Sequence, residues 1–261
     1  MSGHYNRIGL PLLVILFQLT VSACAPAVTP EITLEATITP TLTATPTATI
    51  VWFPPTSTPT PFPTRVITPT QDHRPSLGEV LLTDDFSSPD SWLLGRTSSG
   101  SAALGKNELT IAISEPGAYV YSVRQTPVFS DFYVEITASP TLCRGQDEYG
   151  LLIRMSSPGD FYRFSLSCDG QVRLDRLVGG AASSPQPWTP SGSVPPGAPS
   201  SSRLGVWALG KEMRFFVNDE YQFTVNDPLL PSGNLGVFAR SAGQLDVTVS
   251  FSDLIVYDIN Q

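Results

Sequence analysis

The chain has 261 residues, 25 of them proline, and a formal net charge of −8 at pH 7. No cluster of lysine and arginine stands out, which excludes a nucleic-acid-binding surface of the usual basic kind. The acidic balance also disfavours electrostatic binding to anionic lipid headgroups.

Residues 1–23 have the features of a secretory signal peptide. Arg7 supplies a positive charge, and an apolar run from Ile8 to Leu19 follows it. About a dozen apolar residues are too few for the roughly 20 that a membrane-spanning helix needs, so we expect an export signal that is cleaved off.

The residues Val21-Ser22-Ala23-Cys24 resemble the lipobox of bacterial lipoproteins, in which an aliphatic residue and two small ones precede the modified cysteine. Small side chains let the signal peptidase reach the backbone, and the Cys24 thiol accepts the diacylglyceryl group. The resemblance implies two or three acyl chains, whereas a single chain gives only marginal membrane binding. We expect an extracytoplasmic protein that is anchored at the cell surface to membrane lipid through Cys24. An incidental cysteine is the alternative.

Residues 24–75, from the lipidated cysteine onward, repeat threonine and proline and are predicted to form a disordered stalk. Proline fixes φ and removes a backbone donor, so neither helix nor sheet can be sustained. The segment also has too little apolar surface to offset the entropy of ordering. About fifty residues at ~3.1 Å each would reach roughly 150 Å when extended.

Residues 76–261 are predicted to form one all-β domain. Short runs of β-branched and aromatic residues alternate with turn residues, as is typical of strands. In 132–137 every second residue is apolar or aromatic, the period of a strand that is buried on one side. No window of ten residues shows a helical stripe, so we expect an antiparallel jelly-roll β-sandwich. The predicted strands are 80–86, 108–114, 118–124, 132–139, 149–156, 161–168, 172–178, 203–209, 212–217, 221–226, 234–239 and 245–258.

Two short turns are predicted to close hairpins. Cys168-Asp169-Gly170-Gln171 contains an Asp-Gly pair, which favours a type I′ turn with two positive φ angles. The segment 217–220 is a weaker version of the same signal.

The domain contains Asp84-Asp85-Phe86 with Trp92, then Tyr149-Gly150-Leu151-Leu152-Ile153-Arg154, then Gly233-Asn234-Leu235-Gly236-Val237. In order and spacing, these and five further motifs resemble the concanavalin A-like lectin/glucanase superfamily. They are similar to the laminin-G-like and family-16-glycosidase-like domains of bacterial surface proteins, and they span nearly all of 79–258. The resemblance implies the concanavalin A-like sandwich, and its structural motifs indicate fold far more than function. The five further motifs are 131–135, 161–164, 203–206, 215–218 and 251–254.

The predicted domain lacks a recognisable catalytic constellation, so we predict no catalytic residues. Both histidines, His4 and His73, lie before it, which excludes triads and metal sites that need histidine. Catalytic members of the resembled superfamily carry Glu-x-Asp-x-x-Glu on one strand, and this chain does not. Asp147 and Glu148 are adjacent and would point to opposite faces. A pair of carboxylates from different strands, ~5–9.5 Å apart, stays open as an alternative.

Cys143 and Cys168 are expected to form a disulfide, because an exported domain folds in an oxidising compartment. A reactive thiol is the alternative.

Calcium would need 6–8 oxygen ligands. Asp84, Asp85 and Asp253 could converge if the first and last strands are neighbours, although solvated edge residues would give the same pattern. We therefore predict no metal site and no cofactor.

Three aromatic residues are the predicted ligand contacts: Trp188, Tyr149 and Tyr162. Trp188 lies in 179–202, which is predicted to be a long loop without regular structure, and it could stack on a sugar ring or tuck against the sandwich edge. Four tyrosines could line the concave face or lie in the core: Tyr119, Tyr121, Tyr149 and Tyr162.

These observations favour a membrane-anchored, non-catalytic module that binds glycan or other cell-envelope material. The alternatives are a glycoside hydrolase of the same superfamily and a structural or protein-interaction domain.

Overall fold

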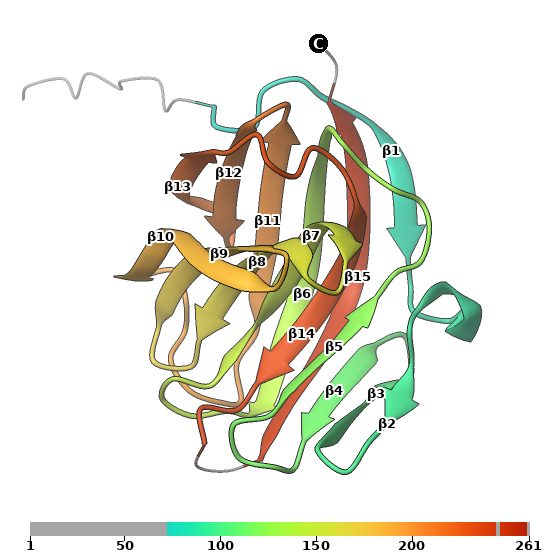
Figure 1. Ribbon diagram of the computed structural model, residues 1–261, viewed down its shortest axis with the longest axis vertical. Coiled ribbons are helices and arrows are strands. Elements are labelled where there is room, and N and C mark those ends of the chain that lie inside the picture. Colours follow the sequence, from blue (N-terminus) through green and yellow to red (C-terminus); the bar gives the residue numbers. More distant parts are fainter. Residues whose placement is uncertain (1–71, 244–245, 260–261) are drawn as a thin grey trace, which may run out of the picture. The chain divides into compact units, whose positions relative to one another are not determined.

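The computed structural model describes residues 72–243 and 246–259 (Figure 1). The predicted signal peptide, Cys24 and the stalk up to residue 71 lie outside these residues. Within the described part of the chain, no helix is long and apolar enough to cross a membrane.

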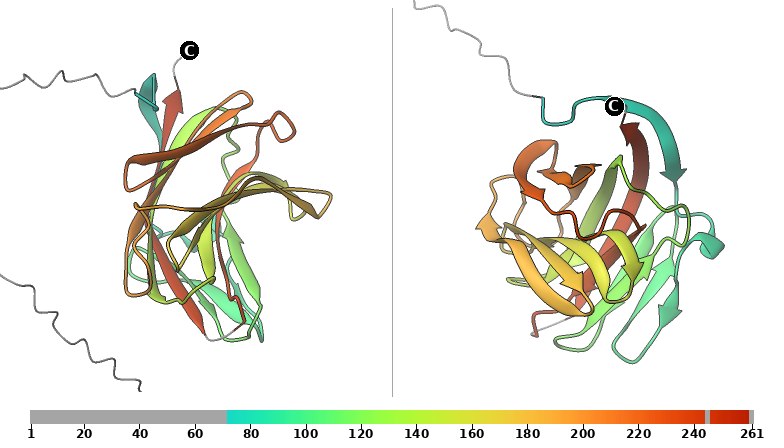
Figure 2. Two further views of the ribbon diagram at one scale, coloured as in Figure 1. Left: turned by 90° about the vertical axis from the view of Figure 1, so that its left-hand side faces the viewer. Right: turned by 45° about the horizontal axis from the view of Figure 1, so that its top comes forward.

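The described chain is a sandwich of two antiparallel sheets, which Figure 2 shows as two layers. The nine-stranded sheet has the order β13-β12-β11-β6-β15-β4-β3-β2, with β1 paired to β15. Its strands are β1 (Leu77–Asp84), β2 (Gly95–Arg96), β3 (Gly100–Leu104), β4 (Leu109–Ile113), β6 (Phe132–Leu142), β11 (Ser202–Leu209), β12 (Glu212–Val217), β13 (Glu220–Asn226) and β15 (Val247–Ile259).

The six-stranded sheet has the order β10-β9-β8-β7-β14-β5. Its strands are β5 (Tyr119–Val123), β7 (Glu148–Ser157), β8 (Asp160–Ser167), β9 (Gln171–Val178), β10 (Ala181–Pro190) and β14 (Asn234–Arg240). One short 3-10 turn, Pro89–Ser91, follows β1. The predicted all-β antiparallel sandwich is confirmed.

The core lies between the inner faces of the two sheets. β4 shows how the strands supply this core. Its residues Leu109, Ile111 and Ile113 are buried, and the two residues between them are half-buried. Phe164 of one sheet packs against Phe215 of the other with ring centroids 4.9 Å apart. Apolar alternation along each strand therefore sets which face of each sheet turns inward.

Residues just before the predicted boundary at 76 pack against the sandwich. The carbonyl of Pro75 accepts a hydrogen bond from Trp207 Nε1 at 3.1 Å. The His73 ring stacks on Tyr221 with centroids 3.9 Å apart, and Arg74 lies 5.4 Å from the Phe216 ring centroid. The proline-rich composition gave no sign of these contacts, and His73, which lies before the predicted boundary, packs against the sandwich.

One predicted turn differs from the structure. In the β8–β9 hairpin only Gly170 has a positive φ, and its N–H donates to the Ser167 carbonyl at 3.1 Å. A single left-handed glycine at the end of the three residues between Ser167 and Gln171 is typical of a longer hairpin loop, not of a type I′ turn. The two positive φ angles occur instead at Asn218 and Asp219, in the weaker of the two signals.

The predicted long loop 179–202 contains a strand. β10 pairs with β9 as an edge strand and includes Pro185, Pro187 and Pro190. Proline is tolerated there because the donors of an edge strand that face away from the sheet have no partner strand. Its prolines and serines suggested a loop, which is why the sequence prediction failed here.

Candidate functional site

The outer face of the six-stranded sheet gathers charged and aromatic side chains. β8 shows how alternation puts them there: Phe164 and Leu166 are buried in the core, so Arg163 and Ser165 project from the opposite side. We call the following residues the outer-face cluster: Tyr119, Tyr121, Glu148, Arg163, Arg173, Asp175, Trp188, Phe238 and Arg240.

Two small residues form the floor beneath this cluster. Gly150 and Ser165 lie opposite each other in neighbouring strands, and Ser165 also lies opposite Arg173. A Cβ at Gly150 would collide with the carbonyl oxygen of Phe164, so only glycine fits. Ser165 is fully buried. The long side chains of the cluster therefore lie over small residues and cover them.

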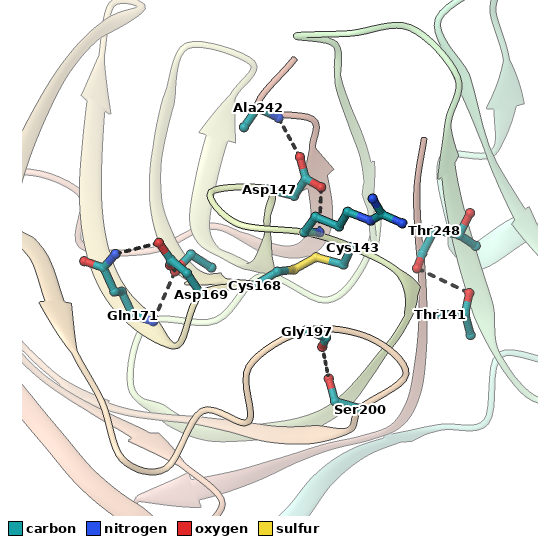
Figure 3. Close-up of a disulfide and its surroundings, with 12 residues drawn as sticks. Thr141, Cys143, Asp147, Cys168, Asp169, Gln171, Gly197, Ser200, Ala242 and Thr248 are labelled. Carbon is teal, nitrogen blue, oxygen red and sulfur yellow. Dashed lines mark hydrogen bonds between the residues drawn. A yellow bond between two sulfur atoms is a disulfide. The ribbon is translucent and has the colours of Figure 1, made fainter. Parts of the chain in front are cut away.

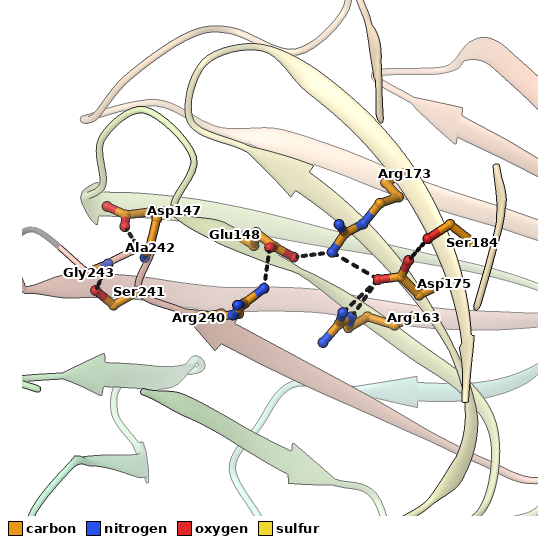
Figure 4. Close-up of polar contacts among 10 residues, drawn as sticks. All are labelled: Asp147, Glu148, Arg163, Arg173, Asp175, Ser184, Arg240, Ser241, Ala242 and Gly243. Carbon is orange, nitrogen blue, oxygen red and sulfur yellow. Dashed lines mark hydrogen bonds and ion pairs between the residues drawn. The ribbon is translucent and has the colours of Figure 1, made fainter. Parts of the chain in front are cut away.

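Three arginines and two carboxylates form a connected network (Figure 4). Asp175 accepts hydrogen bonds from Arg163 Nη2 at 2.6 Å and is paired with Arg173 Nη2 at 2.9 Å. Glu148 accepts from Arg173 Nη2 at 3.0 Å and from Arg240 Nη1 at 2.9 Å. Both carboxylates are buried. A buried charge is costly unless it is paired, and here each carboxylate is paired with two arginines.

Aromatic rings flank the network on both sides. The Arg173 guanidinium lies 4.4 Å from the ring centroid of Trp188, on the edge strand β10. The Arg163 guanidinium lies 5.6 Å from the ring centroids of Tyr119 and Phe238. Burial raises the pKa of Tyr119, so its hydroxyl stays neutral. Both edge strands of the sheet, β10 and β5, thus contribute aromatic rings to the face.

The three predicted ligand contacts have different outcomes. Trp188 belongs to the outer-face cluster and is partly exposed. Tyr149 and Tyr162 are 1% and 0% exposed and lie in the core. They share their sides of β7 and β8 with apolar residues such as Leu151 and Phe164. A ligand cannot reach them there, so the prediction is wrong for these two tyrosines.

Sequence reasoning missed the charged members of the cluster. Arg173 and Asp175 alternate with buried Leu174 on β9, and this pattern could have marked an outward face. Glu148 and Arg240 are 92 positions apart, so nothing local indicates that they pair. Only the strand order β7-β14 brings them together.

The predicted disulfide between Cys143 and Cys168 is confirmed (Figure 3). Cys143 follows β6 of the nine-stranded sheet and Cys168 follows β8 of the six-stranded sheet, so the bond links the two layers. The Cα atoms are 5.9 Å apart. Asp147 orders the adjacent loop, since its carboxylate accepts from the backbone N–H groups of Arg144 and Ala242, each at 2.8 Å.

Asp84 is already fully engaged by protein donors. Its carboxylate accepts from the Phe86 N–H at 2.8 Å, from Trp92 Nε1 at 3.1 Å and from Arg124 Nε at 2.7 Å. Asp84 does lie beside the last strand, where it pairs with Leu254. Among the described residues, no group of three or more His, Cys, Asp or Glu is placed to hold a metal ion. Asp84 thus ties β1 to its neighbours.

Glu148 and Asp175 come from different strands, as a catalytic pair on separate strands would. Both bond to the same Nη2 of Arg173, so those oxygens are no more than about 6 Å apart, an upper limit that is compatible with the ~5–5.5 Å separation of carboxylates in retaining glycosidases. Each carboxylate, however, is held by two arginines. Protonating either one would weaken those ion pairs, whereas a general acid must carry a proton that it can deliver to the substrate.

The fold has many solved relatives. A carbohydrate binding module, CBM66 from Bacillus subtilis, matches with a TM-score of 0.53 and 16% identity, over 64% of this chain and 96% of that one. The catalytic domain of an endo-1,3-beta-glucanase (laminarinase) from Thermotoga petrophila matches with a TM-score of 0.51 and 10% identity, over 70% and 98%.

A Bacillus subtilis protein of unknown function with a galectin-like fold matches with a TM-score of 0.53 and 13% identity, over 71% and 99%. No protein-family model matches the chain, and no curated protein is similar to it in sequence. The chain has the concanavalin A-like fold. At these identities the likeness concerns the fold alone.

Proposed function

We propose that this protein is a membrane-anchored extracytoplasmic lipoprotein whose β-sandwich binds glycan without cleaving it. The glycan contacts the outer-face cluster of the six-stranded sheet. The observation that carries the proposal is the combination on that face of partly exposed Trp188 with Arg173 and Arg240. Aromatic rings offer apolar faces to the C–H groups of a sugar, and guanidinium groups donate to its oxygens.

The structural relatives support this choice of ligand class. One is a carbohydrate binding module and another is a laminarinase catalytic domain. We extend carbohydrate binding to this chain because its outer-face cluster supplies ring faces and hydrogen-bond donors on one surface.

A panel of soluble polysaccharides in affinity electrophoresis tests the proposal, with the full chain in mild detergent. We expect at least one polysaccharide to retard the protein and Trp188→Ala to abolish most of the retardation. Tyr221→Ala is the matched control, because Tyr221 is a partly exposed aromatic residue at the nine-stranded sheet. Retardation that Tyr221→Ala removes and Trp188→Ala does not would contradict the proposed site.

Glycoside hydrolysis is the second candidate function, and the spacing of Glu148 and Asp175 is the observation that favours it. We expect no release of reducing ends from any polysaccharide in the panel. Hydrolysis that Glu148→Gln abolishes, while Asp169→Asn in the β8–β9 turn leaves it unchanged, would replace our proposal with an enzyme.

Membrane anchoring rests on the lipobox-like sequence ending at Cys24, which lies outside the described residues. We expect the exported protein to take up labelled palmitate and to fractionate with membranes. Cys24→Ser should remove both properties. Unchanged labelling in Cys24→Ser would contradict the anchor.

A further inference from the structure

Among the charged members of the outer-face cluster, more hydrogen-bond donors than acceptors are left unused. All four carboxylate oxygens of Glu148 and Asp175 already accept, three of them from arginines and Asp175 Oδ1 from Ser184 Oγ at 2.6 Å. Each arginine carries five N–H donors. Arg240 has one hydrogen bond from Nη1, and Arg173 Nε is buried without a partner among the described residues.

The charge of the network has the sign opposite to that of the whole chain. Three guanidinium groups face two carboxylates, which leaves one positive charge on this face, while the chain carries −8. Arg240 stands at the edge of the network with a side chain that is 44% exposed, whereas its partner Glu148 is 6% exposed. The part of the network that solvent can reach is therefore cationic.

We propose that this face selects anionic saccharides, in which a carboxylate or sulfate group accepts from Arg240 while a sugar ring packs on Trp188. The inference rests on the proposed glycan binding and narrows its ligand class. A neutral sugar presents hydroxyl groups that donate as well as accept, whereas the two carboxylates that could accept from them are buried and already hold arginine or serine donors. An anionic group accepts only, which matches what the face offers.

The general charge of the protein cannot produce this preference. A chain with a net charge of −8 repels polyanions at long range, so tighter binding of an anionic polymer must come from a local site. The preference should weaken as salt rises, because Arg240 is partly exposed to solvent.

Matched pairs of polymers test the ligand class, with the full chain in mild detergent and binding measured by calorimetry. The pairs are polygalacturonate with its fully methyl-esterified form, and dextran sulfate with dextran. We expect the anionic member of at least one pair to bind at least about tenfold more tightly at low salt, the effect of one charge-assisted hydrogen bond. The two pairs distinguish a carboxylate from a sulfate ligand.

The outcomes separate this inference from the proposed function. Binding of neutral polymers as tight as that of their anionic partners would overturn the selectivity and leave glycan binding intact. Failure of both anionic and neutral polymers to bind would overturn both.

Variants of matched charge locate the site. Arg240→Gln should weaken binding of the anionic polymer about tenfold, and Arg240→Lys should restore part of it. Arg203→Gln is the control, because Arg203 is 47% exposed and pairs with Asp219 at the nine-stranded sheet. It removes the same charge and should leave affinity unchanged. Equal losses in Arg240→Gln and Arg203→Gln, with unfolding midpoints unchanged, would mean nonspecific attraction and overturn the proposal.

Discussion

The outer faces of the two sheets differ in what covers them. On the nine-stranded sheet, Tyr133, Trp207 and Phe216 form a separate apolar cluster, and the segment Asp72–Pro75 lies across it. On the six-stranded sheet, arginines and carboxylates lie over a floor of glycine and serine and form the network of Figure 4.

We infer from this difference that the two outer faces have different roles, one closed by the chain itself and the other open to a ligand. An exposed aromatic patch on a monomer invites association, so the chain uses its own entry segment to close one face. The other face combines an apolar cluster around Leu152, Phe161 and Phe238 with arginines and carboxylates that tolerate water. It can therefore stay available to a ligand without becoming an aggregation site.

The largest expected effect comes from breaking the charge network. Arg163→Ala leaves buried Asp175 with only Arg173 as its cationic partner, and we expect it to destabilise the fold by about 3 kcal/mol. Denaturant unfolding measures the loss. Arg203→Ala, which removes an exposed pair at the opposite sheet, should cost less than about 1 kcal/mol. Similar costs for the two variants would contradict the contrast between the faces.

Removing the disulfide tests the link between the layers. The double variant Cys143→Ser, Cys168→Ser should lose about 3 kcal/mol of stability, because the bond closes a loop of 25 residues and restricts the unfolded chain. The same denaturant titration measures it. A loss below about 1 kcal/mol would show that the sheets hold each other without it.

Deleting the entry segment should have a somewhat smaller effect. A chain that begins at residue 77 loses the hydrogen bonds to His73 and Pro75 and uncovers the aromatic cluster, so we expect it to be about 2 kcal/mol less stable than one that begins at 72. The shorter chain should also bind the dye ANS. Equal stability and no dye binding would contradict the covering role of Asp72–Pro75.

The smallest effect concerns acid. Burial opposes ionisation of Asp227, but the Leu229 N–H and the ion pair with Arg176 outweigh it and lower the pKa of this carboxyl. A lowered pKa contributes stability that is present above the unfolded value near ~4 and is lost as pH falls through the folded value. Asp227→Asn should therefore flatten the loss of stability below about pH 4. An unchanged acid slope would contradict this.

The sequence predicted the fold well where alternation was strong. β6 and β8 show that pattern, and the two domain cysteines indicated their own pairing. It failed where composition hid the structure. β3 is rich in glycine and alanine, β10 is rich in serine and proline, and Asp72–Pro75 continues a proline-rich stretch.

The candidate site was harder to predict than the fold. Trp188 was predicted as a ligand contact because it lies in the segment 179–202, which reads as a long loop. Tyr149 and Tyr162 were predicted to contact a ligand, but their side chains face the core. Which side of a strand faces the core depends on how that strand is placed in the sandwich, and its own sequence does not show this. The network joins Glu148, Arg173 and Arg240 from three strands, and their pairing follows from strand order, which no local pattern contains.

Hydroxyl-radical footprinting tests the central claim most directly, because one experiment reports on both outer faces. With a polysaccharide that binds in the panel, we predict reduced oxidation of Trp188 and Tyr121 at the six-stranded sheet. Oxidation of Tyr221 at the nine-stranded sheet should stay unchanged. Protection of Tyr221 without protection of Trp188 would contradict the account and place the glycan on the other face.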